Sequence, residues 1–96
     1  MRPEAKLEDY FINKCKENHI LQYKLTAGET GIPDRLIICG FTAFVELKAK
    51  NGKLSERQKL IIKRIRNHGG IVFVPFNKSD IDEIINKILK YNEKQD

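Results

Sequence analysis

The apolar residues of this chain follow two spacings, and their alternation predicts the order of helices and strands. Apolar positions three and four residues apart predict amphipathic helices, whereas short runs rich in Val, Ile and Phe predict strands. In chain order, the pattern predicts a helix over 3–18, strands over 20–26, 34–39 and 42–48, a helix over 55–68, a strand over 71–75 and a final helix capped by Ser79 or Asp80. This order, α-β-β-β-α-β-α, describes an α/β protein with a mixed sheet flanked by helices.

Glycine and asparagine mark the turns between these elements. Gly40 lies between two β-type runs and predicts a hairpin, and Asn51-Gly52 marks a further turn. The run 71–75 is apolar throughout, which predicts a central strand parallel to a neighbour. We find no repeat or linker, so residues 1–96 are expected to form one domain with a polar tail from about Asn92.

The predicted hairpin brings two acidic residues together. Asp34 and Glu46 are equally far from Gly40, so they should face each other across the strands, with Cβ atoms roughly 5 Å apart. Two carboxylates at this distance repel each other unless a cation or a proton lies between them. Lys48 follows Glu46 on the same face of the strand. A hard divalent ion would relieve the repulsion, and this combination suits binding and cutting of a phosphodiester.

Composition is compatible with this chemistry without proving it. The 96 residues carry a net charge of +5, which fits a polyanionic partner. The two cysteines, Cys15 and Cys39, lack the spacing of metal ligands and are expected to be buried free thiols of a reducing compartment. No run approaches the length of a membrane span, and the charged N-terminus does not resemble a signal peptide. We therefore expect a cytoplasmic protein (host cell cytoplasm if it is viral) that does not bind a membrane.

Three short motifs in this order resemble the PD-(D/E)xK nuclease superfamily, and more closely the short stand-alone members of the VRR-NUC family, the virus-type replication-repair nucleases. They are Gly31-Ile-Pro-Asp34-Arg35, Phe44-Val-Glu-Leu-Lys48 and Ser55-x-x-Gln58. The resemblance runs from about Glu4 to Ile85 and implies a restriction-endonuclease-like core. It also implies phosphodiester cleavage that depends on Mg²⁺ or Mn²⁺.

The resemblance assigns roles to individual residues. Asp34 and Glu46 would bind the metal together with the backbone carbonyl of Leu47, and Lys48 would orient or activate the attacking water. Gln58 would lie near the site from the following helix. The acidic residue of the first helix matches Glu8, which would join the site and could also bind the metal; Glu4 matches less well. Small stand-alone members are associated with homodimers that act on branched DNA, such as four-way junctions.

Each assignment has an ordinary structural alternative. Asp34 could be a turn residue, and Glu46 with Lys48 a pair on a solvated strand face. Gln58 could serve only a capping box with Ser55, or serve both the cap and the site. Glu8 could pair with a lysine or arginine elsewhere in the fold. Lys59, Lys63 and Arg66 share a helical face, with Lys53 and Arg57 nearby. These residues could be a solvated basic face or could contact phosphates.

The leading hypothesis is a metal-dependent DNA endonuclease selective for DNA structure. A chain without an appended recognition domain is better suited to reading DNA shape and backbone than a long base sequence. Two alternatives stay open at this point: a non-catalytic DNA-binding or assembly subunit on the same fold, and an RNA-directed nuclease.

Overall fold

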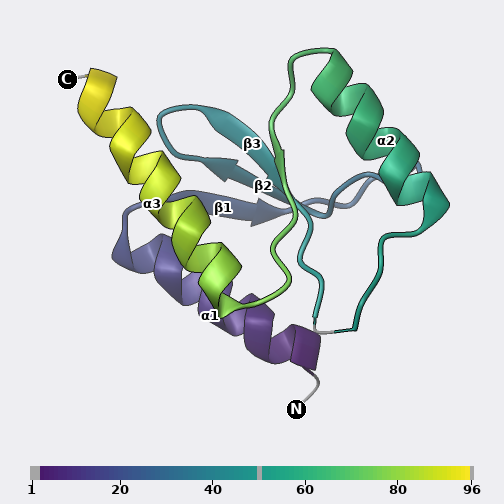
Figure 1. The fold of residues 1–96 in the computed structure, drawn as a ribbon, viewed down its shortest axis with the longest axis horizontal. Helices are drawn as coiled ribbons and strands as arrows, with labels where there is room; N and C mark the ends of the chain where they lie inside the picture. Colours follow the sequence, from purple (N-terminus) through teal and green to yellow (C-terminus); the bar gives the residue numbers. More distant parts are fainter. Residues whose placement is uncertain (1–2, 50, 96) are drawn as a thin grey trace.

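The computed structural model describes residues 3–49 and 51–95, which form three helices and a four-stranded sheet in the predicted order. Figure 1 shows α1 and α3 lying close to each other, with α2 apart from them on the far side of the strands. The elements are α1 (Pro3–Glu17), β1 (Leu21–Lys24), β2 (Arg35–Ile38), β3 (Thr42–Val45), α2 (Glu56–Asn67), β4 (Val72–Phe73) and α3 (Lys78–Gln95).

The sheet confirms the predicted hairpin and its register. Its strand order is β1-β2-β3-β4, with the first three strands antiparallel and β4 parallel to β3. Arg35 pairs with Val45, and Ile38 pairs with Thr42 across the turn. Gly40 has φ +91° in this turn, a conformation that costs glycine little because it has no Cβ. The first residues beyond the ladder are therefore Asp34 and Glu46.

The strand at 71–75 is parallel to its neighbour, as predicted, but its expected central position is wrong. β4 forms the edge of the sheet, next to β3. Its run is apolar on both faces because both faces are covered: Val72 is buried on the side of α2, and Phe73 packs against the main core. The pairing extends beyond the two residues of the strand, since the N–H of Lys48 donates to the carbonyl of Pro75 at 3.0 Å.

The main core lies between the sheet and the pair of helices α1 and α3. Strand residues that alternate inward from β2 and β3 meet the apolar stripes of both helices, which gives the sequence its two spacings. α2 packs against β4 on the opposite face, and its Ile61 and Ile62 are buried. The core cluster consists of Leu7, Phe11, Cys15, Ile20, Ile37, Cys39, Ala43, Val45, Ile81, Ile84, Ile85 and Ile88.

The helix ends agree with the sequence at α2 and differ at α3. Ser55 caps α2 through the predicted capping box with Gln58. For α3, the prediction of Ser79 or Asp80 as the cap is wrong. Asn77 caps instead, because its Oδ1 accepts from the N–H of Asp80 at 2.7 Å while the Asp80 carboxylate accepts from Phe76 N–H at 2.9 Å.

The end of α3 is more ordered than the expected polar tail. The helix continues past Asn92 to Gln95. Asn92 donates from its side chain to the carbonyl of Cys39 at 3.0 Å, which ties the helix to the hairpin turn. Phe41 and Tyr91 add an edge-to-face ring contact nearby, with centroids 4.9 Å apart. Within residues 3–49 and 51–95, we find no helix with the length and apolar character that a membrane span requires.

Candidate active site

Glu46 lies just beyond β3, with its backbone held by the sheet and its side chain buried. Its N–H donates to the carbonyl of Phe73 at 3.0 Å, and only 7% of the residue is exposed. Because side chains alternate along extended backbone, Glu46 lies on the same face as Phe44 and Lys48. The sheet thus places a carboxylate where it has few water molecules to solvate it.

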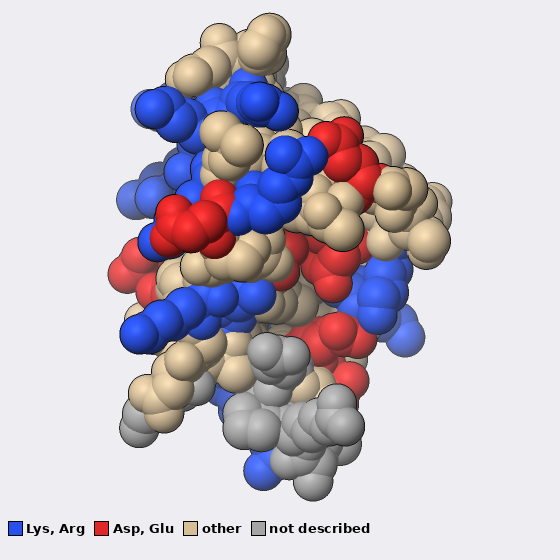
Figure 2. Space-filling view, turned by 90° about the vertical axis from the view of Figure 1, so that its right-hand side faces the viewer, with Lys and Arg blue, Asp and Glu red and all other residues tan. Residues whose placement is uncertain are grey.

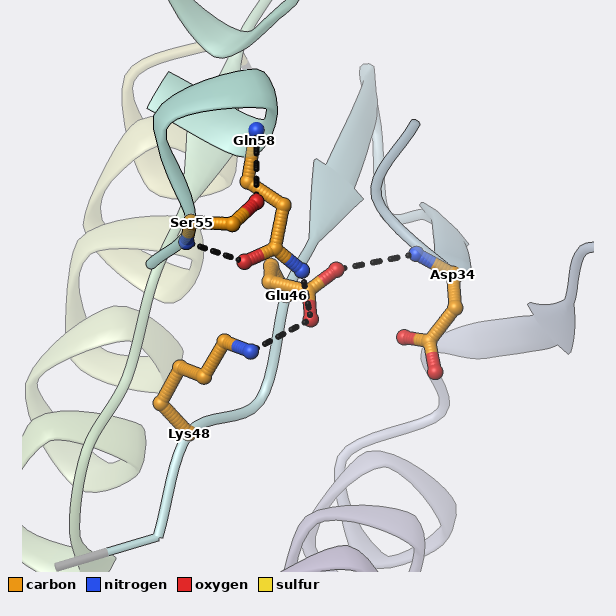
Figure 3. Close-up of polar contacts among 5 residues, drawn as sticks. All are labelled: Asp34, Glu46, Lys48, Ser55 and Gln58. Carbon is orange, nitrogen blue, oxygen red and sulfur yellow. Dashed lines mark hydrogen bonds and ion pairs between the residues drawn. The ribbon is translucent and has the colours of Figure 1, made fainter. Parts of the chain in front are cut away.

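Asp34 meets Glu46 at the end of the hairpin, as the register predicted. The Asp34 N–H donates to Glu46 Oε1 at 3.3 Å, and the Asp34 carbonyl accepts from Leu25 N–H at 2.6 Å. Figure 3 shows the Asp34 amide directed at Glu46 and its carboxylate turned away from the contact. The preceding residue, Pro33, is buried. Its fixed φ helps to hold the chain where it enters the site.

Lys48 and Gln58 contact the other oxygen of Glu46. Lys48 Nζ lies 3.7 Å from Glu46 Oε2, and Gln58 Nε2 donates to the same oxygen at 3.4 Å. Gln58 also accepts the Ser55 N–H at 2.9 Å through its own Oε1 (Figure 3). The glutamine therefore serves both the helix cap and the buried carboxylate, one of the alternatives that the sequence left open.

The surroundings raise the pKa of Glu46 above its ordinary value of 4.5. Burial is the largest cause, because it penalises the charged form, and the nearby Asp34 carboxylate adds like-charge repulsion. The Lys48 ammonium and the Asp34 N–H act in the opposite direction without overcoming these effects. The charged form of Glu46 is thus destabilised in the protein alone, and a cation placed between the two carboxylates would stabilise it.

Regular alternation of the backbone would direct the carbonyl of Leu47 toward the same place. The N–H groups of Glu46 and Lys48 both bond to the β4 side of the strand. In extended backbone, the polar groups of successive residues point to opposite sides, so those of Leu47 face the end of β2. Continuing the register of the hairpin would place Pro33 opposite, and proline has no N–H to donate. In this extended register the Leu47 carbonyl would have no N–H partner on the opposite strand.

A family model identifies the fold that carries these residues. The model of the VRR-NUC domain matches residues 3–75, a span that includes Asp34, Glu46, Lys48 and Gln58. The chain belongs to the VRR-NUC family. A solved structure of a VRR-NUC domain is similar to this chain, with a TM-score of 0.81 and 30% sequence identity, and the match covers 90% of this chain and 97% of that chain. The comparison with curated proteins finds no match.

Membership of the VRR-NUC family confirms the predicted fold and gives the protein a nuclease-type core. VRR-NUC nucleases generally use divalent metals. Within the described residues, no three His, Cys, Asp or Glu side chains gather closely enough to form a metal cluster of their own. Asp34, Glu46 and the Leu47 carbonyl nevertheless fit Mg²⁺, which favours one or two carboxylates and completes its shell with water and phosphate oxygens.

Glu8 lies apart from the four residues gathered at Glu46. Its Oε1 is 2.9 Å from the Arg35 guanidinium, which also donates to Gln22 Oε1 at 2.6 Å. Arg35 is only 4% exposed, so Glu8 supplies the counter-charge of a buried cation. The inward position of Arg35, in alternation with Ile37, was a sequence signal for this pairing. The side chain of the weaker candidate, Glu4, lies outside the described part of the chain.

The basic residues of the VRR-NUC domain have different surroundings. Lys53 and Lys63 are exposed, and Lys59 forms an exposed ion pair with Glu56 at 3.2 Å. Arg57 instead pairs with Glu29 and donates to the Thr30 carbonyl at 3.3 Å. Lys59 and Lys63 border a groove of about 320 Å³, together with Leu54, Ile62, Arg66 and Asn67.

The face turned toward the reader in Figure 2 combines both signs of charge. Acidic side chains occur in its middle and toward both sides, and Lys and Arg side chains lie most densely on the upper left (Figure 2). Arg66 shares the helical face of Lys59 and Lys63, as its spacing of three and seven residues from them predicted. It lines the same groove, and its guanidinium donates to the Val72 carbonyl at 2.6 Å.

The raised pKa of Glu46 predicts how stability depends on pH. A carboxyl whose folded-state pKa is raised holds its proton more tightly in the folded protein. Its contribution is therefore most favourable below pH 4.5 and is lost as the pH rises through the raised value. In EDTA, Glu46→Gln should remove this loss and make the protein more stable than wild type at neutral pH. Urea unfolding over about pH 4 to 8 measures the difference.

The exposed substitution Glu93→Gln is the control for the pH experiment and should leave the pH profile of unfolding unchanged. If Glu46→Gln lowers the free energy of unfolding at neutral pH in EDTA, the account of a destabilised carboxylate is wrong.

The contact with Arg35 predicts that Glu8 contributes to stability. Glu8→Gln keeps the shape of the side chain but leaves a buried guanidinium without its anionic partner. The free energy of unfolding should fall by about 1–3 kcal/mol, the range for a lost hydrogen bond to a charged group. Urea unfolding measures the loss, and Asp9→Asn on the exposed side of α1 is the control. Unchanged stability together with lost cleavage would instead place Glu8 in the chemistry of the site.

Proposed function

We propose that this VRR-NUC domain is a divalent-metal-dependent endonuclease that hydrolyses phosphodiester bonds of branched DNA, such as four-way junctions. The observation that carries the proposal is the buried Glu46 carboxylate, which contacts Asp34, Lys48 and Gln58 at the end of the hairpin. The arrangement opposes folding through like-charge repulsion, so a protein that only binds DNA would gain nothing from keeping it. It serves a nuclease, because a metal ion requires the clustered oxygens.

In this proposal each residue has a distinct role. Asp34, Glu46 and the Leu47 carbonyl would hold Mg²⁺ or Mn²⁺, which when bound polarises a phosphoryl oxygen and lowers the pKa of water. Lys48, beside Glu46, orients the attacking water and offsets the negative charge that develops on the phosphate. Gln58 fixes the rotamer of Glu46 through its hydrogen bond to Oε2. Figure 3 draws no hydrogen bond or ion pair from the Asp34 carboxylate to the other four residues shown, and in this proposal that carboxylate binds the metal.

The DNA would lie across the face in Figure 2, with backbone phosphates near the exposed lysines of α2. Lys59 and Lys63 border one groove, and Lys53 is exposed on the segment that precedes α2. Phosphate contacts of this kind fix the position of DNA without reading its sequence. The enzyme would then select its DNA substrates by their shape. Branched DNA of this kind arises in replication, repair and recombination, and we place the enzyme in the cytoplasm.

We also propose that the enzyme is a homodimer, because one site cuts one strand and a branched duplex needs paired nicks. β1 is the free edge of the sheet, and α2 leaves the β1–β2 half of its face uncovered. Leu21 and Tyr23 are each 55% exposed there, and Ile38, the cross-strand partner of Leu21, is 42% exposed. A twofold axis at this surface would bury the apolar residues of both copies.

The catalytic proposal predicts loss of cleavage on loss of the metal or its ligands. Asp34→Asn and Glu46→Gln should abolish nicking while retaining the fold. Lys48→Ala should slow it about 10²–10³-fold, the usual cost of losing one charge-stabilising group. Lys48→Arg should rescue poorly, since a planar guanidinium cannot replace a compact ammonium in a crowded site.

Cleavage of labelled four-way DNA in Mg²⁺ or Mn²⁺, with single-stranded RNA assayed in parallel, measures these effects. Lys90→Ala on α3 is a control that should retain full activity. Activity that persists in EDTA would exclude the metal mechanism, and preferential cutting of the RNA would replace DNA as the substrate.

The dimer proposal predicts that one surface controls both assembly and paired nicking. Leu21→Glu combined with Tyr23→Glu places charge on the apolar face and should convert a dimer to a monomer by light scattering. The monomer should still cut one strand of a DNA junction. It should lose the paired cutting of two strands. A monomeric wild type at micromolar concentration, with equal cutting of linear and four-way DNA, would contradict the proposal.

A further inference from the structure

Arg57 contacts the loop between β1 and β2, although its side chain stays 41% exposed. Its terminal nitrogen pairs with Glu29, and its Nε donates to the carbonyl of Thr30 at 3.3 Å. Both partners belong to the loop that ends at Asp34. Arg57 also directly precedes Gln58, whose side chain bonds to Glu46. Adjacent residues in the first turn of α2 thus contact the loop that leads to Asp34 and the carboxylate of Glu46.

The same loop packs tightly on α2 at Gly31. This glycine has φ +89°, and a Cβ there would come within 2.9 Å of Arg57 Cγ and 3.0 Å of Ile61 Cγ1. Such distances leave no room for a side chain, so the loop backbone lies directly against the helix. The aliphatic part of the Arg57 side chain packs against the loop at Gly31. Its guanidinium contacts the two preceding residues, Glu29 and Thr30.

Only Ile32 and Pro33 separate the contact at Gly31 from Asp34. Pro33 is buried and has a restricted φ, so little slack exists between the contact at Gly31 and the carboxylate. A loop released from Arg57 would therefore displace Asp34 against its two backbone hydrogen bonds, from its N–H to Glu46 and to its carbonyl from Leu25. Glu46 would keep its place, because the sheet and Gln58 hold it independently.

We propose that Arg57 is a positioning residue that sets the place of Asp34 relative to Glu46. The first turn of α2 determines the separation of the two carboxylates, with Arg57 holding one through the loop and Gln58 holding the other directly. The inference rests on the proposed metal-dependent function. It differs from the sequence prediction for Arg57, in which the guanidinium contacts DNA phosphate.

The first experiment measures Mn²⁺ binding to the protein without DNA, by electron paramagnetic resonance. Arg57→Gln should weaken Mn²⁺ binding roughly 10-fold, as expected when a residue that orients a ligand is lost. Glu29→Gln should weaken it in the same direction but less, because the Thr30 contact and the packing at Gly31 remain. The charge swap of Arg57→Glu with Glu29→Arg should recover part of the affinity. Arg64→Gln, at an exposed position of the same helix, is the matched control for loss of one positive charge on α2.

The second experiment measures the salt dependence of binding to four-way DNA in EDTA. A phosphate contact by Arg57 would appear as a drop of roughly 0.9 in the slope of log K against log salt in Arg57→Gln. A positioning role leaves that slope unchanged. Glu29→Gln separates the two roles further, because release of Arg57 would steepen the slope only if the arginine contacts phosphate.

A third measurement keeps the inference separate from the proposed function. The Asp34 amide bonds to Glu46, so its hydrogen exchange reports the placement of Asp34 without any metal. Faster exchange in Arg57→Gln supports the inference. Unchanged exchange together with wild-type Mn²⁺ affinity overturns it. A wild-type protein that binds no Mn²⁺ would instead overturn the proposed function, and the exchange of the Asp34 amide alone would then decide the role of Arg57.

Discussion

The site depends on a carboxylate that is buried beside a second carboxylate. Glu46 is held at the end of β3 by the parallel pairing with β4, where burial and Asp34 both raise its pKa. Three groups from different elements lie around its two oxygens: the Asp34 N–H, the Lys48 ammonium and the Gln58 amide. These contacts reduce the penalty without removing it. In the proposed function, a divalent cation bound at this place would offset the remaining unfavourable charge.

The arrangement of elements follows from this constraint. The β2–β3 hairpin supplies Asp34 and Glu46 at equal distances from its turn, and the crossover through α2 returns the chain as β4 beside β3. α2 begins directly above the end of the hairpin, so that its capping residue Gln58 reaches Glu46 (Figure 3). The helix cap and the site therefore share one side chain, and a change at either one affects the other.

Helices α1 and α3 stabilise the sheet that carries the site residues. α1 and α3 cover the inner face of the sheet, and Glu8 of α1 neutralises Arg35, the residue after Asp34. An uncompensated guanidinium at this depth would be costly, since a buried charge needs a partner. The acidic position of the first helix thus contributes to the stability of the strand that carries Asp34, whether or not it also takes part in catalysis.

The sequence by itself determined the order of the elements, the register of the hairpin and the proximity of Asp34 and Glu46. These features depend on local information: the period of apolar residues, a glycine turn and the equal distances that a hairpin imposes. The capping box at Ser55 was equally local, whereas the cap of α3 by Asn77 was missed because several neighbouring polar residues could each have capped the helix. Local spacing determines which elements form. It does not show which of several adjacent polar residues caps a helix.

Only the tertiary structure decided which distant side chains meet. It placed β4 at the edge of the sheet, paired Glu8 with Arg35, and bound Arg57 to the loop at Glu29. The run 71–75 is apolar because helices cover both of its faces, which a sequence cannot distinguish from a central position in the sheet. A charged side chain likewise carries no local sign of its partner, because that partner is set by how elements far apart in the chain pack together.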